Sequence, residues 1–496
     1  MSPVNKKQKT SSPSSNNKEL ILSVILTGGP AGHWTHPDDR THELNKLETW
    51  VEFAQLLERG KIHSLFIADH LAIYSTYEQS FKPAVREGMF VPRIDPSALV
   101  SALSQATESL NFGITFSTFS EHPYHFARRL TSLDHFSDGR VSWNIVTSFL
   151  KNVQDQLGGE FLKHDLRYLK AQEYLDVVYK LLLSSWRDDA VQYNKETGVF
   201  ADPDLVREIN HEGEWFKVPG PAISEPSRQR FPVIFQAGTS KAGKVFAAEN
   251  AELVFVTGLH RSGGKEIQEI RDLAAKFGRD PYSIKFIAGA TFHIGKTHDE
   301  ALEKLAKQRK YFPEIAKAVG FSGVSDIDLS KYELDDIIKP PAENNAHQTI
   351  TKNIINSGSG KTKRQILETY DRSGLFVGTP EEIVEQVKEY VDKYDVDGFN
   401  IEAAIFPTDI EDFVDLLVPE LQKQGLFWKD YKYKGGTFRE NIFGKKFLSE
   451  DHPAYGLKWD SSKTQEEFEA DLIKVEKKRK ETRNKIKKEL GLPTDN

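Results

Sequence analysis

The chain of 496 residues contains no cysteine. This excludes disulfides, thiolate metal sites and cysteine nucleophiles together. It also fits a reducing compartment, where disulfides are rare. Any redox chemistry would therefore need a bound cofactor.

Long apolar runs and a strong charge of one sign are also lacking. No stretch approaches the roughly 18 apolar residues that a membrane helix needs. Residues 1–18 are polar and have no apolar centre, so we expect a disordered tail rather than a secretory signal. The 66 basic and 73 acidic residues give a net charge of −7 and are spread along the chain. We therefore expect a cytoplasmic protein with neither a nucleic-acid nor a membrane partner.

Short apolar runs, each followed by an amphipathic stretch, recur between residues 20 and 425. Continuous apolarity is typical of parallel strands that are covered on both faces. A strand followed by a helix, eight times over, predicts a closed (β/α)8 TIM barrel, an α/β fold that we assign to residues 19–445. The eight expected strands are Ile21–Leu26, Ser64–Ala68, Leu110–Phe116, Arg140–Val146, Pro232–Gln236, Glu252–Val256, Ile284–Phe292 and Gly398–Ala404.

Helix patterns lie between these strands. Examples are 47–59 and 168–183, and Thr379-Pro380 has the form of a capped helix start. Three segments, 74–96, 195–230 and 312–375, are too long for ordinary connections and are expected to be insertions in the barrel loops. Residues 446–496 form a charged C-terminal helical extension. Its helix at 465–490 has few apolar positions, so we expect an exposed appendage or an oligomer contact.

Small and polar residues follow the ends of several expected strands, where the functional groups of such a barrel gather. The fifth strand is the most informative, because Gly238-Thr239-Ser240 leads directly into a helix. Hydroxyls beside the first N–H groups of a helix form a site for phosphate. The same three residues could equally be an ordinary helix cap. The other strand-end candidates are Asp69, Thr115 and Asn144.

His164 and Tyr168 lie four residues apart on an expected helix and face the same way. Both could donate to a phosphate or a flavin, or both could be packing groups. A metal site would need His and carboxylate groups at a ligand spacing such as H-x-H or H-E-x-x-H, and the candidates lack it. Those candidates are Asp69, His70, His122, His125, Asp134 and His135.

A set of short motifs recurs in order along residues 20–445. The motifs are Leu65–Asp69, Ser117-Thr118, His122–Arg129, Ser132–His135, Ser137–Arg140, Trp143–Ser148, His164–Tyr168, Gly220-Pro221, Gln236–Ser240 with Ala247-Ala248, Val377–Glu381 and Asp397–Phe399. Together they resemble the luciferase-like flavin monooxygenases, and within them the nitrilotriacetate, EDTA and dibenzothiophene-sulfone monooxygenase branch.

The resemblance implies a monooxygenase that binds FMN without a covalent bond. It would take FMNH2 from a separate NAD(P)H:flavin reductase and react with O2 through a C4a-hydroperoxyflavin to oxidise a small organic substrate. We expect a homodimer or a homotetramer. The implied flavin contacts are Asp69, Thr115, Asn144, His164, Tyr168, Thr239 and Ser240, and the implied catalytic residues are His33 and Tyr74.

The chain departs from the family pattern at three places. Thr35 follows Trp34 where an arginine is frequent, His63 replaces an aspartate before the second strand, and the stretch 149–159 lacks the usual Asn-Phe-Gly. Without an arginine clamp at Thr35, polycarboxylate substrates are not expected. Two alternatives stay open at this stage: a flavin-binding barrel without turnover, and a metal-dependent barrel hydrolase.

Overall fold

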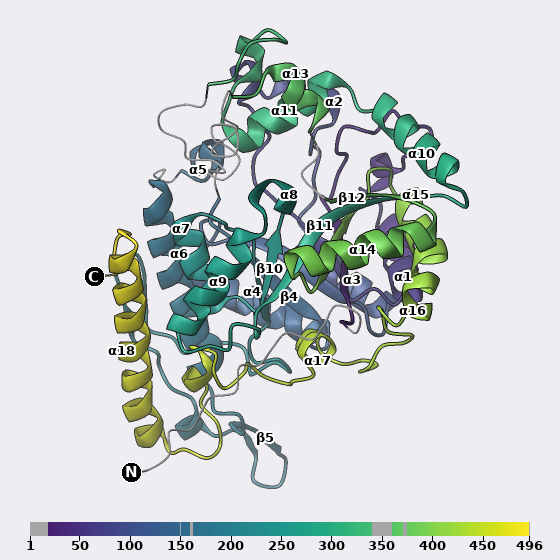
Figure 1. The fold of residues 1–496 in the computed structure, drawn as a ribbon. Coiled ribbons are helices and arrows are strands. Elements are labelled where there is room, and N and C mark those ends of the chain that lie inside the picture. Colours follow the sequence, from purple (N-terminus) through teal and green to yellow (C-terminus); the bar gives the residue numbers. More distant parts are fainter. Residues whose placement is uncertain (1–17, 149, 159–161, 340–359, 371–373, 496) are drawn as a thin grey trace, which may run out of the picture.

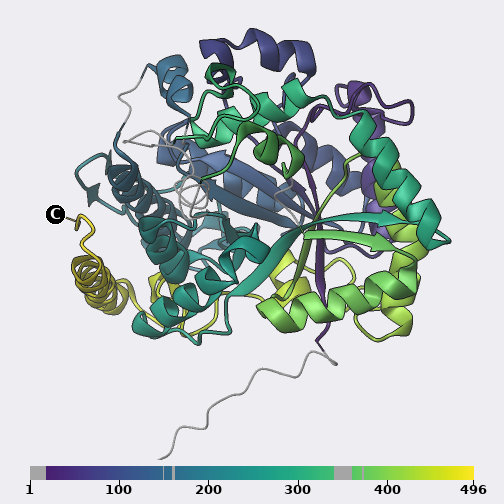
Figure 2. The ribbon, with the colours of Figure 1, turned by 45° about the horizontal axis from the view of Figure 1, so that its top comes forward.

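The computed structural model describes residues 18–148, 150–158, 162–339, 360–370 and 374–495. Eight parallel strands form a closed barrel with helices around it, as Figures 1 and 2 show. Closure comes from the pairing of β10 with β11 and of β13 with β1. The strands are β1 (Ile21–Leu26), β2 (Ser64–Ile67), β3 (Asn111–Ser117), β4 (Val141–Val146), β9 (Val233–Gln236), β10 (Leu253–Val256), β11 (Lys285–Ile294) and β13 (Gly398–Glu402). The predicted (β/α)8 barrel is confirmed.

The strands are buried on both faces, which explains their continuous apolarity. One cluster, which includes Phe66, Phe235 and Ile287, fills the barrel interior together with Phe438. Phe438 begins helix α17 (Phe438–Phe443), so a helix from beyond the last strand contributes to the interior. A larger cluster joins the outer faces of the strands to the surrounding helices.

The helices follow the sequence patterns closely. The predicted helix at 47–59 is α1 (Leu47–Arg59). Thr379 caps α14 (Pro380–Tyr394) in a reciprocal pair of hydrogen bonds with Glu382. Other helices of the outer layer are α3 (Ser97–Ala106), α4 (Pro123–Phe136), α6 (His164–Tyr179), α7 (Lys241–Asn250), α9 (Lys265–Lys276), α10 (His298–Lys310) and α16 (Val418–Lys423).

A ninth strand of the sheet was not predicted. β12 (Gly374–Gly378) pairs with the second half of β11, from Ala290 to Ile294, while β10 pairs with the first half. β11 has ten residues and so extends beyond its neighbours. The segment GLFVG was assigned to an insertion because a short run between two glycines gives little strand signal.

Two of the insertions pack together above the carboxyl ends of the strands, at the top of Figure 1. They contribute α2 (Lys82–Glu87), α11 (Glu314–Ser325) and α13 (Lys363–Glu368). Their buried side chains form two small apolar clusters apart from the barrel core. We call the described parts of these two insertions, residues 74–96, 312–339 and 360–370, the cover. Residues 340–359 and 371–373 of the third insertion, and residues 1–17 with the expected tail, lie outside the described part of the chain.

The middle insertion forms two short hairpins. They pair β5 (Val191–Asn194) with β6 (Val199–Ala201), and β7 (His211–Glu212) with β8 (Lys217–Val218). None of the helices among the described residues is long and apolar enough to cross a membrane.

The C-terminal helix α18 (Gln465–Glu489) is less exposed than its composition suggested. It lies beside α6 and α7 in Figure 1, and Phe468 and Ile486 are buried against the main core. Arg479 and Arg483 are also buried, with carboxylates of α6 and α7 as partners. The expectation of a wholly exposed appendage was wrong, because charged residues can be buried where opposite charges meet them.

Gly398 gives a test of barrel closure. A methyl group on its Cα would collide with the backbone of Ile21 on β1. We expect Gly398→Ala to lower the free energy of unfolding by about 3 kcal/mol, because backbone cannot yield as a side chain can. The neighbouring change Ile401→Val, which only removes a buried methylene, should cost about 1 kcal/mol. Urea unfolding measures both, and equal losses would contradict the close approach at Gly398.

Candidate functional site

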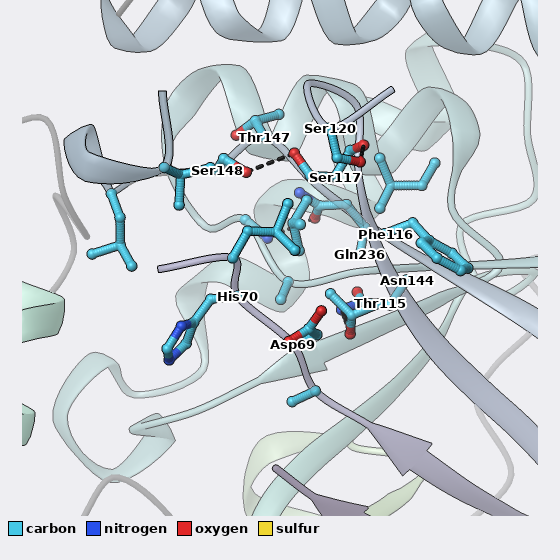
Figure 3. Close-up of a pocket in the computed structure, with 18 of the residues that line it drawn as sticks. Asp69, His70, Thr115, Phe116, Ser117, Ser120, Asn144, Thr147, Ser148 and Gln236 are labelled. Atoms are coloured by element: carbon cyan, nitrogen blue, oxygen red, sulfur yellow. Dashed lines mark hydrogen bonds between the residues drawn. The ribbon is translucent and has the colours of Figure 1, made fainter. Parts of the chain in front are cut away.

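The carboxyl ends of β2, β3, β4 and β9 surround a cavity of about 620 Å³ together with the first turns of α6 and α7. This volume is within the range of small-molecule and cofactor sites. Figure 3 shows polar side chains from these strands turned toward a shared space. The lining residues with polar side chains include Asp69, His70, Arg93, Thr115, Ser117, Asn144, Thr147, Ser148, His164, Arg167, Tyr168, Gln236, Thr239 and Ser240.

Seven residues that the sequence suggested as flavin contacts therefore lie around one cavity. They come from β3, β4 and α6 and from the loops that follow β2 and β9, which are far apart in the sequence. All seven are in the lining: Asp69, Thr115, Asn144, His164, Tyr168, Thr239 and Ser240.

The loop between β9 and α7 is built tightly around the hydroxyl of Tyr168. That hydroxyl hydrogen-bonds to Ser240, Thr147 and Gln236. A methyl group on Gly238 would collide with it, and one on Gly243 would lie 2.8 Å from it. Burial raises the pKa of Tyr168, so its hydroxyl keeps its proton and can donate.

Ser240 has two roles in this loop. Its Oγ accepts the N–H of Gly243 at 3.1 Å and so caps α7. Its hydroxyl proton stays available to a partner. The helix-cap interpretation and the phosphate-site interpretation of Gly238-Thr239-Ser240 are therefore compatible. The positive end of the α7 dipole lies at the same wall of the cavity.

Asn144 and Thr115 form a polar pair on neighbouring strands. The Asn144 Nδ2 donates to Thr115 Oγ1 at 2.9 Å. The Oδ1 of Asn144 is buried and has no hydrogen-bond partner among the described residues. A buried acceptor without a partner is costly in a folded protein, so a ligand group that donates there would be favoured.

Asp69 is held beside Arg93, which comes from the first insertion. The two side chains approach to 3.7 Å, and Arg93 also donates to the carbonyls of Ala68 at 3.1 Å and Phe90 at 2.9 Å. Burial raises the pKa of Asp69, and the nearby guanidinium opposes that rise. The cover and the barrel wall thus meet at a fixed ion pair.

His33 and Tyr74 are not among the residues that line this cavity. His33 lies against the cover and Tyr74 within it. The ring of His33 packs on Phe312 at 4.0 Å and its Nε2 contacts Gln308 at 2.7 Å, while its buried Nδ1 has no hydrogen-bond partner among the described residues. Tyr74 stacks on His70 at 4.8 Å, and His70 does line the cavity.

Several lining residues were not selected from the sequence. Arg167 lies three residues after His164 on α6, and its Nη1 donates to the Ser148 carbonyl at 2.7 Å. Gln236 is the last residue of β9, and its Oε1 accepts the Gly238 N–H at 2.8 Å. Helical spacing and strand-end position could have revealed these two. Arg93 lies within an insertion and gave no such signal.

No group of three or more His, Asp or Glu side chains that could hold a metal ion occurs within the described ranges. The six metal candidates are dispersed instead. Asp134 binds Gln229, His125 contacts Glu121 on its own helix, and His70 stacks on Tyr74.

The model of the luciferase-like monooxygenase family matches residues 26–395. A long-chain alkane monooxygenase of Geobacillus thermodenitrificans is 42% identical over 85% of this chain and 93% of its own length. The dimethyl-sulfide monooxygenase of Hyphomicrobium sulfonivorans is 39% identical over 88% of this chain and 93% of its own. A solved riboflavin lyase with modified FMN has a TM-score of 0.82 at 31% identity, and covers 89% of this chain and 100% of its own.

The chain belongs to the luciferase-like monooxygenase family. It is a flavin-dependent monooxygenase, as the resemblance implied. Nitrilotriacetate monooxygenase component A, at 30% identity, and dibenzothiophene-sulfone monooxygenase, at 33%, are also relatives. The alkane and dimethyl-sulfide enzymes are more similar than the branch that the motifs suggested. Family membership decides against a hydrolase and against a binding protein without turnover.

The burial of His33 makes the free energy of unfolding depend on pH. Burial lowers its pKa from 6.5 to about 3. The unfolded chain therefore takes up a proton below about pH 6.5 that the folded chain refuses, and stability is lost as the pH falls. Between pH 7.5 and 5.5 we expect the wild type to lose about 1.4 kcal/mol more unfolding free energy than His33→Gln. Urea unfolding at the two pH values tests this, and parallel losses would show that His33 is protonated in the folded state.

Proposed function

We propose that the cavity holds reduced FMN, with the phosphate at the start of α7 and the flavin ring between β2, β3 and β4. The observation that carries this proposal is the convergence of seven side chains from separate elements on one cavity of cofactor size. The residues also fit the group chemically, because hydroxyl donors, a helix N-terminus and a buried acceptor lie on its walls.

Ser240, Thr239 and Tyr168 would hold the phosphate. Ser240 and Tyr168 contribute hydroxyls, and α7 contributes first-turn N–H groups and its dipole. His164 begins α6 on the same side of the cavity, with its Nδ1 2.7 Å from Asp165. A carboxylate partner orients an imidazole.

Asp69, Thr115 and Asn144 would line the flavin ring or the ribityl chain. The Oδ1 of Asn144 is an acceptor for an N–H or O–H of the cofactor. Phe66, Phe116 and Phe255 supply apolar walls. When bound, reduced flavin supplies the electrons and the carbon centre that activate O2 for transfer of one oxygen atom.

The protein must keep water away from that centre during oxidation. The cover provides described apolar groups for this purpose, among them Tyr74, Ala316 and Val319, and it shares a cluster with Leu150 and Val153 of the cavity wall. The stack of Tyr74 on His70 connects the cover to the lining. In this proposal, His33 and Tyr74 act at the cover, by holding or moving a proton near the reacting edge.

A separate NAD(P)H:flavin reductase would supply the reduced cofactor. The chain has no G-x-G-x-x-G nicotinamide fingerprint after a strand. The name of the nitrilotriacetate relative, component A, describes one member of a multi-component enzyme. Both observations support a division of labour between two proteins.

The charges of the cavity favour a substrate without carboxylates. Arg93 is paired with Asp69 at 3.7 Å, and Arg129 with Glu121 at 3.3 Å. These pairs lower the attraction of Arg93 and Arg129 for an anion, because each is already compensated. Arg167, the third arginine of the lining, donates to the Ser148 carbonyl at 2.7 Å. Position 35 is a threonine rather than an arginine, so the loop after β1 also lacks an arginine clamp for a carboxylate at this position. A small organic substrate of low charge therefore fits better than a polycarboxylate.

Ser240 allows a direct test of the phosphate site. Ser240→Asp keeps a capping oxygen but adds a negative charge where the phosphate would lie. We expect it to weaken FMN binding by about a hundredfold, and Ser240→Ala by about tenfold, from the lost charge-assisted hydrogen bond. Flavin fluorescence in the presence of protein measures both affinities.

Riboflavin is the matched ligand, because it lacks the phosphate. Both Ser240 variants should bind riboflavin within about twofold of the wild type. Riboflavin has no phosphate that could lose a hydrogen bond to Ser240 or be repelled by the carboxylate introduced in Ser240→Asp. Thr379→Ala, which removes a cap far from the cavity, controls for helix capping alone. Equal losses for FMN and riboflavin would place the phosphate elsewhere.

A second prediction concerns His33. If it manages a proton near the reacting edge, His33→Ala should raise the ratio of H2O2 to oxygenated product by about a hundredfold, the lower end of what a general acid or base contributes. The assay supplies FMNH2 with a reductase and measures H2O2 and product together. Gln308→Leu keeps His33 but removes its Nε2 partner and should give a smaller rise. Unchanged coupling in His33→Ala would remove the residue from the mechanism.

A further inference from the structure

The helix α18 contributes to a buried cluster of six charges that joins three helices. Asp176 of α6 and Glu249 of α7 supply the inner carboxylates, and Arg479 and Arg483 of α18 supply the guanidinium groups. Arg483 Nε lies 2.6 Å from Glu249 Oε2, and Arg479 Nη2 lies 3.0 Å from Asp176 Oδ1. With Lys487 and Asp495 included, the cluster contains three acidic and three basic side chains.

The end of the chain returns to this cluster. Asp495 contacts Arg483 at 2.6 Å and Lys487 at 2.7 Å through its carboxylate. Its backbone N–H donates to Asn484 Oδ1 at 2.9 Å, and its carbonyl accepts from Asn484 Nδ2 at 3.1 Å. Asp495 therefore binds Nη1 of Arg483, while Nε and Nη2 of Arg483 bind Glu249. A buried arginine whose three nitrogens all have carboxylate partners holds those carboxylates in one arrangement.

The cluster lies on the same face of α6 as the candidate phosphate ligand Tyr168. Tyr168, Gln172 and Asp176 follow at intervals of four residues, which is one side of a helix. Each of these three side chains binds a residue outside α6. Tyr168 bonds to Ser240, Gln172 accepts from Asn250 Nδ2 at 2.9 Å, and Asp176 meets the arginines. Three successive cross-links therefore join α6 to α7, and the last of them passes through α18.

Both helices begin at the cavity, so their separation determines where Tyr168 and Ser240 stand. The polar groups of Gln172 and Asn250 are buried and leave little freedom between the two helices. If the arginines were missing, the buried carboxylate of Glu249 would lose its ion pairs, and the partly buried Asp176 would keep the hydrogen bond from Gln172 but lose both guanidinium partners. Their repulsion would separate the far ends of α6 and α7.

We propose that Arg483 is a positioning residue for the cofactor: by holding Glu249 of α7 and Asp176 of α6, it keeps Tyr168 and Ser240 at the spacing that binds the FMN phosphate. The C-terminal helix is thus a brace for the phosphate site rather than an appendage. This inference rests on the proposed function, because it assumes that the phosphate lies at the start of α7. It adds the C-terminal segment to the residues that determine cofactor affinity.

The test compares FMN with riboflavin in full-length variants. Arg483→Met keeps the length of the side chain and removes the charge. We expect its affinity for FMN to fall by about tenfold and its affinity for riboflavin by no more than about twofold, because only the phosphate needs the hydroxyls at the correct spacing. Arg483→Lys, which keeps one charge, should recover part of the loss. Fluorescence titration measures the affinities, and circular dichroism at the same temperature checks that each variant is folded.

Two further variants keep the test decisive. Lys276→Met breaks the exposed pair of α9 with Glu489 of α18 and should leave both affinities unchanged. Asp495→Asn loosens only the return of the chain end and should shift the FMN to riboflavin ratio in the same direction by about threefold. It is the variant to use if Arg483→Met does not fold.

The outcomes separate the two proposals. If Ser240→Asp weakens FMN selectively but Arg483→Met and Asp495→Asn weaken both flavins equally, or neither, the brace is overturned and the phosphate site stands. If Arg483→Met fails to fold and Asp495→Asn leaves the ratio unchanged, the brace is overturned as well. If Ser240→Asp does not distinguish the two flavins, the phosphate site itself fails, and the brace fails with it.

Discussion

Closure of the barrel is the constraint on which the site depends. The pairing of β10 with β11 and of β13 with β1 closes the eight barrel strands on themselves, so all eight parallel strands end at the same rim. Asp69, Thr115, Asn144 and Gln236 are separated by up to 167 positions in the chain, yet each lies at or just past the end of a strand. An open sheet would spread these side chains along a line. A closed barrel places them around one cavity, and two helix starts complete the wall.

The same closure explains which parts of the molecule the sequence could predict. Strands such as β2 and β10 carry apolar residues on both faces, and a single sequence reveals that directly. β12 was not predicted, because it pairs with the residues of β11 that extend beyond the other strands. The length of β11 is a property of another segment of the chain. The buried state of Arg479 and Arg483 could not be predicted either. It depends on Asp176 and Glu249, which are more than 200 positions away.

The candidate site likewise contains residues that the sequence predicted and residues that it did not. Strand-end position and helical spacing suggested residues that do line the cavity, such as Asp69 and Tyr168. Their suggested roles are still proposals. The catalytic roles of His33 and Tyr74 came from family resemblance; His33 lies against the cover and Tyr74 within it, and neither is in the lining. Arg93 carries a salt bridge to Asp69 from within an insertion, where neither periodicity nor strand order applies.

The cover has its own small apolar clusters, and their buried residues are distinct from those of the barrel core. A substitution at Ala318 or Phe321 therefore changes the packing of the cover and leaves the strands with all their partners. Residues over the mouth of the barrel can therefore be exchanged without rebuilding the cavity wall below them. Relatives of one architecture that act on molecules as different as alkanes and dimethyl sulfide are what such a separation would allow.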